Sequence, residues 1–181
     1  DGSPQGKTAY LTEHYHTPVP GCTGHCHGFP NMTQEEVNQI FVKAYQHQVQ
    51  IYAHCNGDAS TDMMIKGHQF AEKKLNTPGI DRRTVIIHSQ VMRPEQLDSY
   101  KKFNFYPTFF TNHTYFWGDA HMANLGAKRA SFISPMASAK KKGLKFANHN
   151  DAPVSPISQM MVLWSSVNRV SKSGVVVGPN E

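Results

Sequence analysis

Three apolar stretches of this sequence each end in a side chain that can bind a metal ion or move a proton: His54, His88 and Asp151. The histidines lie 34 residues apart, which suits one strand–helix–strand unit, and the 63 residues from His88 to Asp151 leave room for two more. Neutral imidazoles are good zinc ligands, and a carboxylate beside a metal can also take a proton from an activated water. The pattern therefore predicts a divalent-metal site, zinc being the expected ion, with Asp151 as ligand and general base.

Such residues meet only if parallel strands deliver them to one edge, and the apolar pattern predicts such strands. Strands are predicted over residues 49–55, 84–88, 105–111 and 144–148, and helices over residues 59–75, 94–103, 135–142 and 157–169. A further helix opens with a capping box at residues 33–36. This alternation predicts the α/β class, with a parallel sheet and covering helices. In a (β/α)₈ barrel, the C-terminal strand ends all open onto one rim.

Two segments carry no regular pattern and are predicted to be irregular: residues 1–32, rich in glycine and proline, and residues 112–130. In the second segment, His113 and Trp117 are candidates for binding substrate, with His113 donating a hydrogen bond to a carbonyl. An aromatic loop that only packs over the barrel mouth is an equally open interpretation. His149 is predicted to be structural, on the opposite side of the strand from Asp151.

Asp58 follows a glycine at the start of a predicted helix, so a helix cap is favoured over a metal ligand for this residue. Three cysteines are an odd number and indicate no disulfide framework. Cys22 and Cys26, with His14 and His16 nearby, could form a compact zinc site. Their spacing matches no standard zinc finger, so a non-enzymatic metal-binding module built on this Cys/His loop is kept only as an alternative function.

The composition is that of a globular domain, with 39% hydrophobic and 17% charged residues among 181. The net charge of +5 includes one basic run, residues 140–142, which fits the last turn of a helix. No aromatic stacking pattern accompanies that run, so no nucleic-acid partner is predicted. No apolar run approaches the roughly 20 residues of a membrane span. Nothing in the sequence indicates a compartment.

Four motifs, in order, resemble the metal-dependent amidohydrolase superfamily: residues 54–58, 87–90, 151–154 and 167–169. The most similar branch includes N-substituted formamide deformylases and many uncharacterised putative amidohydrolases, and residues 1–11 resemble the loop after its fourth strand. The resemblance covers nearly the whole chain. It implies that His54 and His88 are ligands from the fifth and sixth strands, and that Asp151 is the ligand and general base of the eighth. Arg169 matches a position that is structural or substrate-facing, and we expect it to bind substrate.

The resemblance implies strands five to eight of a partial (β/α)₈ TIM-type barrel, with residues 1–181 forming a fragment of one barrel domain. The family's His-x-His pair and its bridging lysine or glutamate would precede Asp1, and one or two metal ions would bind in the intact protein. The implied reaction is hydrolysis of amide or cyclic amide C–N bonds in a small molecule. The expected partner is the remainder of the parent barrel, and the isolated chain should be inactive and self-associate. A standalone α/β binding domain is the remaining alternative.

Overall fold

The computed structural model describes residues 1–181 and contains one four-stranded parallel sheet in the order β1-β2-β3-β4. The strands are β1 (Tyr52–Cys55), β2 (Val85–His88), β3 (Tyr106–Phe109) and β4 (Ala147–Asn148). The helices are α1 (Gln34–Gln46), α2 (Asp58–Leu75), α3 (Pro94–Phe103), α4 (Asn112–Ser131), α5 (Met136–Lys141) and α6 (Gln159–Asn168). Sequential parallel neighbours joined through helices are the building units of the predicted barrel. The chain therefore forms part of a (β/α)₈-type barrel, as its sequence predicted.

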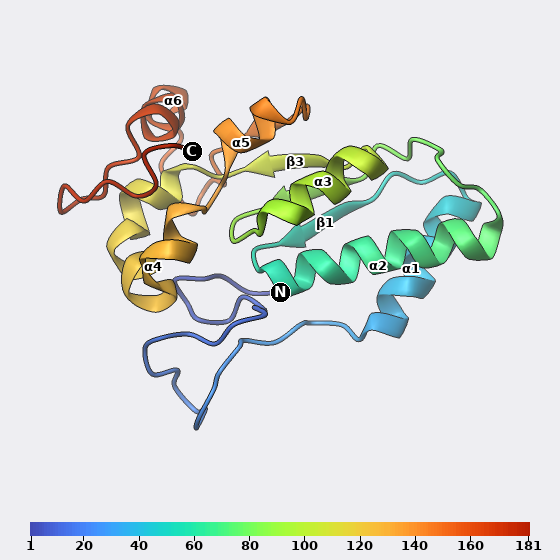
Figure 1. Ribbon diagram of the computed structural model, residues 1–181, viewed down its shortest axis with the longest axis horizontal. Coiled ribbons are helices and arrows are strands. Elements are labelled where there is room, and N and C mark those ends of the chain that lie inside the picture. The colour runs from blue at the N-terminus through green and yellow to red at the C-terminus, as the bar shows by residue number, and fades with distance from the viewer.

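The strand ends are in register, which decides where polar side chains can meet. Cys55 pairs with His88, His88 with Phe109, and Phe109 with Asn148. In Figure 1 the arrowheads point towards the side of the molecule that carries α4 and the N-terminal segment. A residue placed at or just after any of these ends therefore reaches one common rim.

The two faces of the sheet differ in how well they are covered. One face packs against the helices in an apolar core that includes Cys55, Ile86, Leu97 and Phe109. Side chains alternate along a strand, so Tyr52 projects from the other face, where it remains 64% exposed. In a closed barrel this second face would be the interior.

Helix α1 begins where the capping box predicted it. The backbone N–H of Glu36 donates to Thr33 Oγ1, and the Glu36 carboxylate accepts from the N–H of Thr33 at 2.8 Å. Reciprocal bonds of this kind satisfy two donors that a helix start leaves free. The apolar stripe that follows, Val37, Phe41 and Tyr45, is buried against α2. No helix in the chain combines the length and the apolar character needed to cross a bilayer.

Residues 1–32 contain no helix or strand and are held to the barrel by side-chain hydrogen bonds. The buried Asp1 carboxylate accepts from the backbone N–H groups of Tyr10, Asn56 and Gly57 at 2.8–2.9 Å. This bonding fixes the N-terminal segment beside the end of β1 and the first turn of α2. Asp1 therefore places this irregular segment against the rim.

Two sequence predictions are wrong for this part of the fold. Residues 112–130 were predicted to be irregular, but they form α4, because they bury a helical face that includes His113, Gly118 and His121. A break occurs only at Gly126, where φ is 77°. Cys22 and Cys26 were not expected to pair, but a disulfide joins these two residues, which are four positions apart in the sequence.

Candidate metal centre

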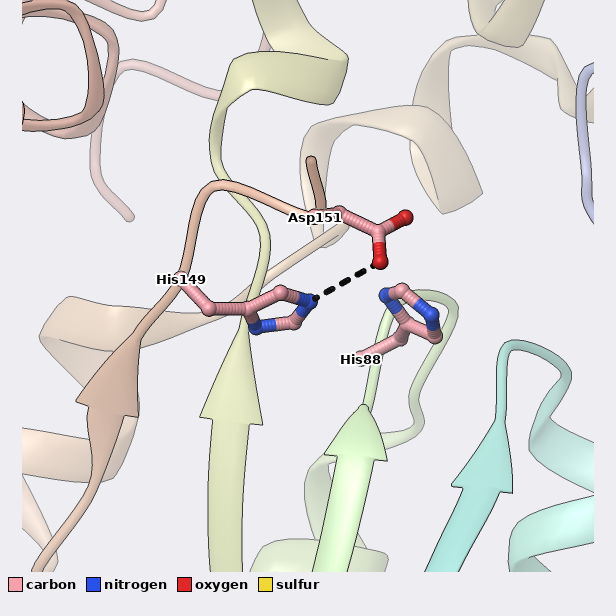
Figure 2. A group of neighbouring side chains, drawn as sticks. All are labelled: His88, His149 and Asp151. Atoms are coloured by element: carbon pink, nitrogen blue, oxygen red, sulfur yellow. Dashed lines mark ion pairs between the residues drawn. The ribbon is translucent and has the colours of Figure 1, made fainter. Parts of the chain in front are cut away.

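A group of three side chains gathers beyond the ends of β2 and β4. Ligand atoms of His88, His149 and Asp151 all lie within 4.8 Å of one another. Figure 2 shows the Asp151 carboxylate facing both imidazole rings, with its Oδ1 4.0 Å from His149 Nε2. Two imidazoles and a carboxylate are the donor set that zinc favours in catalytic sites.

His88 is the buried member of this group, with only 3% of its surface exposed. Its backbone leaves the strand with φ 71°, so the ring turns towards the rim. The pKa of His88 is lowered to about 3, mainly because the ring is buried. The neighbouring His54 and His149 lower it further. The imidazole is therefore neutral near pH 7, and its buried Nδ1 has no hydrogen-bond partner within the chain.

His149 follows β4 directly and is joined to β3 by its backbone N–H, which donates to the Phe109 carbonyl at 2.8 Å. Both of its ring nitrogens are buried and have no hydrogen-bond partner in the chain. Burial lowers its pKa, although Asp151 opposes that shift. Buried nitrogens without partners are costly, and coordination of a cation would satisfy them.

The position predicted for His149, on the opposite side of the strand from Asp151, is wrong. Strand β4 ends at Asn148, and Asp151 has φ 55° in the turn that follows. Strand alternation does not govern such a turn, and in a continuous strand residues two apart would in any case share a face. The turn brings His149 and Asp151 together instead of separating them.

The residues present fit a divalent cation. Atoms bound to one zinc ion at about 2.0–2.1 Å lie no more than about 4.2 Å apart. The three side chains approach that spacing, because all their donor atoms lie within 4.8 Å.

His54 lies next to this group. Its ring centroid is 4.5 Å from that of His88, and its side chain is 51% exposed. Its Nδ1 is 4.0 Å from Asp1 Oδ1. Burial lowers the pKa of His54 as well. The structure thus brings His54, His88 and Asp151 to one rim, and His149, which was not predicted as a ligand, lies there as well.

His113 and Trp117 lie on α4, with ring centroids 4.8 Å apart. Phe110 connects them to the rim: its ring is 4.6 Å from His113 and stacks on His149 at 5.3 Å. His113 is 2% exposed, and its Nδ1 is 3.0 Å from Nε2 of the equally buried His121. The sequence pointed to His121 as well as His113 but did not predict their pairing, although the spacing of 113, 117 and 121 is that of one helical face.

Arg169 was expected to bind substrate, and in the structure its side chain is buried against main-chain carbonyls. The side chain is 1% exposed, and its guanidinium donates to the carbonyls of Ile133, Ser134 and Val177 at 2.6–3.2 Å. Burial lowers its pKa to about 10, so the side chain remains charged near pH 7. Because its donors are bound to main-chain carbonyls, Arg169 ties the end of α6 to the segment after α4.

Asp58 also connects segments of the chain. The N-cap of α2 is Gly57, so Asp58 is the first helical residue and not the predicted cap. Its carboxylate accepts from the backbone N–H of Thr12 at 3.0 Å and from Arg93 at 2.6 Å. A carboxylate in a first helical turn also complements the helix dipole. Asp58 therefore joins the N-terminal segment, α2 and α3.

The buried pair on α4 should make folding sensitive to pH. Burial lowers the pKa of His121 to about 4, whereas an unfolded histidine titrates near 6.5. Between these values the unfolded chain binds more protons, so stability falls as the pH falls. We expect His121 alone to lower the free energy of unfolding by about 2 kcal/mol when the pH falls from 7 to 5. Urea unfolding of the metal-free chain at both pH values measures this cost. In His121→Gln the pH difference should shrink by that amount, and an unchanged difference would show that His121 does not contribute.

The comparisons with known proteins agree with the observed fold. A sequence model described as "Amidohydrolase family" matches residues 1–181. An uncharacterized metal-dependent hydrolase from Pyrococcus furiosus superposes with a TM-score of 0.74 at 20% identity, over 93% of this chain and 33% of that chain. Another from Pyrococcus horikoshii OT3 gives 0.76 at 21% identity, over 97% and 33%. The chain thus spans a third of these structures. No curated protein matched.

Proposed function

Because the chain belongs to the amidohydrolase family, we propose that it supplies the metal ligands and the proton acceptor of a metal-dependent hydrolase of amide or cyclic amide bonds. The observation that carries this proposal is the convergence of His88, His149 and Asp151 on one point of the rim. The partnerless ring nitrogens of His88 and His149 support it, because a ligand is the simplest way to satisfy them.

In this proposal His88 and His149 hold the cation through neutral nitrogens, and His54 stands beside them as a further ligand. A bound divalent cation, zinc being the expected one, supplies Lewis acidity that makes a nearby water more acidic. Asp151 is the group that takes the proton of the attacking water and returns it to the leaving nitrogen. Its carboxylate suits this exchange because it is half-buried and faces His149 from 4.0 Å.

The substrate side of the proposal uses α4. His113 would donate a hydrogen bond to the carbonyl oxygen, and the half-buried Trp117 would form an apolar wall beside it. A donor aimed at that oxygen strengthens as negative charge develops on it.

The test of the function is a metal-replacement assay on the full-length protein that contains this chain. The protein is stripped with a chelator and assayed on N-acyl amines, cyclic amides, and carboxylic and phosphate esters, with and without added zinc. We expect C–N hydrolysis that disappears on chelation and returns with metal. Activity that survives chelation, or activity confined to phosphate esters, would refute the proposal.

We further propose that the remainder of the parent barrel covers the open face and edges of this sheet. Helix α6 and the turn before it expose Ile157, Met160, Leu163 and Val167 by 58–81%, and Tyr52 at the start of β1 is 64% exposed. Large apolar side chains exposed along one helix and on an open sheet face mark an interface. These observations support a contact that the described residues do not complete by themselves.

The isolated chain should therefore self-associate. Light scattering is expected to give a mass above the 20.3 kDa of one chain, because burial of α6 stabilises the contact. Met160→Lys with Val167→Lys should restore the single-chain mass. Ala123→Lys with Ala127→Lys adds the same charge at exposed positions of α4 and serves as the control. A single-chain mass for the unsubstituted protein would contradict the expected interface.

The alternative module built on the Cys/His loop receives less support. Cys22 and Cys26 are joined in a disulfide, so neither offers a thiolate to a metal. His27 Nδ1 lies 3.1 Å from the Leu11 carbonyl, which fixes that nitrogen in a hydrogen bond. The rim group is the better metal site because its nitrogens are free and buried.

A further inference from the structure

A pair of buried histidines on α4 lies outside the three-residue metal group. His113 is 2% exposed and His121 is fully buried. His113 Nδ1 and His121 Nε2 are 3.0 Å apart, a hydrogen-bond distance. Two neutral imidazoles at this distance share one proton, so one ring must donate and the other must accept.

The surroundings of His121 decide the direction of that bond. Its other nitrogen, Nδ1, is buried and has no partner within the chain. If His113 donated the bond, the proton of His121 would lie on Nδ1 and form a buried N–H without an acceptor, which folded proteins rarely tolerate. If His121 donates from Nε2, Nδ1 is only an unfilled acceptor. Donation by His121 therefore leaves the smaller unfavourable free energy, because a buried acceptor without a partner is tolerated better than a buried N–H without one.

The tautomer of His113 follows from that choice. Its Nδ1 accepts the bond from His121, so in the neutral ring the proton must be on Nε2. That atom makes no hydrogen bond in the chain and is not among its enclosed, partnerless polar atoms. Phe110 and Trp117 hold the ring at centroid distances of 4.6 and 4.8 Å. His113 therefore keeps a free N–H donor in a fixed orientation.

We propose that His121 is a positioning residue that locks His113 in the Nε2–H tautomer, so that this part of the rim offers only a hydrogen-bond donor. Such a group selects substrates that present a carbonyl or anionic oxygen and disfavours those that present an ammonium or amide N–H at the same point. The substrate part of this inference rests on the proposed function, whereas the tautomer does not.

The tautomer can be measured directly on the chain by nitrogen-15 NMR of labelled histidine. We expect His113 to show a protonated Nε2 and an unprotonated Nδ1, and His121 to show the same pattern. His121→Leu should leave His113 without its donor and give a mixture of tautomers, whereas His68→Leu, a buried histidine elsewhere in the core, should leave the His113 signals unchanged. An Nδ1–H tautomer for His113 in the unsubstituted chain would overturn the inference, and no variant is needed for that measurement.

Kinetics of the full-length protein separate positioning from folding. His121→Leu should lower kcat about tenfold with little change in KM, which is less than the 10²–10³ lost when an oxyanion donor is removed. His121→Gln should recover most of the rate, because its amide can donate at nearly the same point. Equal losses in both variants would refute the positioning role. If the tautomer is as expected but His113→Phe hydrolyses normally, the substrate role of His113 fails together with the selection argument.

Discussion

Asp151→Asn should lower the kcat of the full-length protein for C–N hydrolysis by about 10²–10⁴-fold, the usual contribution of a general base. The amide keeps the shape of the carboxylate but accepts no proton near neutral pH. It also removes a negative charge that faces His149 from 4.0 Å. The measurement is the pH profile of kcat and of kcat/KM for an amide substrate at saturating zinc.

The matched control is Asp81→Asn. Asp81 is exposed and lies ahead of β2, at the opposite end of the strands from the rim. The same chemical change there should leave the profile unaltered. Near-normal turnover of Asp151→Asn at every pH would show that Asp151 does not act as the general base.

Replacement of both His88 and His149 by alanine should abolish stabilisation of the chain by zinc. A ligand that binds only the folded state adds about 2.7 kcal/mol at 100 times its dissociation constant. The double variant lacks both imidazoles of the compact group, and Asp151 with the half-exposed His54 offers too few ligands to hold the ion. Thermal unfolding at several zinc concentrations measures the loss as a flat response of Tm.

His14→Ala with His25→Ala is the corresponding control. These rings lie 4.4 Å apart in the Cys/His loop and carry the same type of donor. The loop variant should keep the full zinc response. If it loses the response and the rim variant keeps it, the chain binds its metal at the loop and not at the strand ends.

The sheet was predictable because its signal is local. Residues 84–88 are a β-branched and apolar run, typical of a buried parallel strand. The ends of such runs marked the rim, and His54, His88 and Asp151 are all found there. The capping box of α1 was equally local, because it depends on residues three apart in sequence.

The residues that were missed depend on turns and on distant contacts. His149 was misplaced because residues two apart in a strand were assigned to opposite faces, whereas they share one face. The turn after β4, which Pro153 signalled, also ends the strand before Asp151. The helical spacing of His113, Trp117 and His121 in α4 was present but was hidden by the aromatic composition of that segment. Arg169 could not have been assigned from sequence, because its three carbonyl partners come from residues 8 to 36 positions away.

The most direct test of the metal centre is anomalous diffraction from zinc-loaded crystals of the chain, with data on both sides of the zinc edge. We predict one strong peak at about 2.0–2.1 Å from a nitrogen of His88, a nitrogen of His149 and an oxygen of Asp151. A zinc peak confined to the Cys/His loop, or crystals with no zinc among these three side chains, would contradict the proposed site.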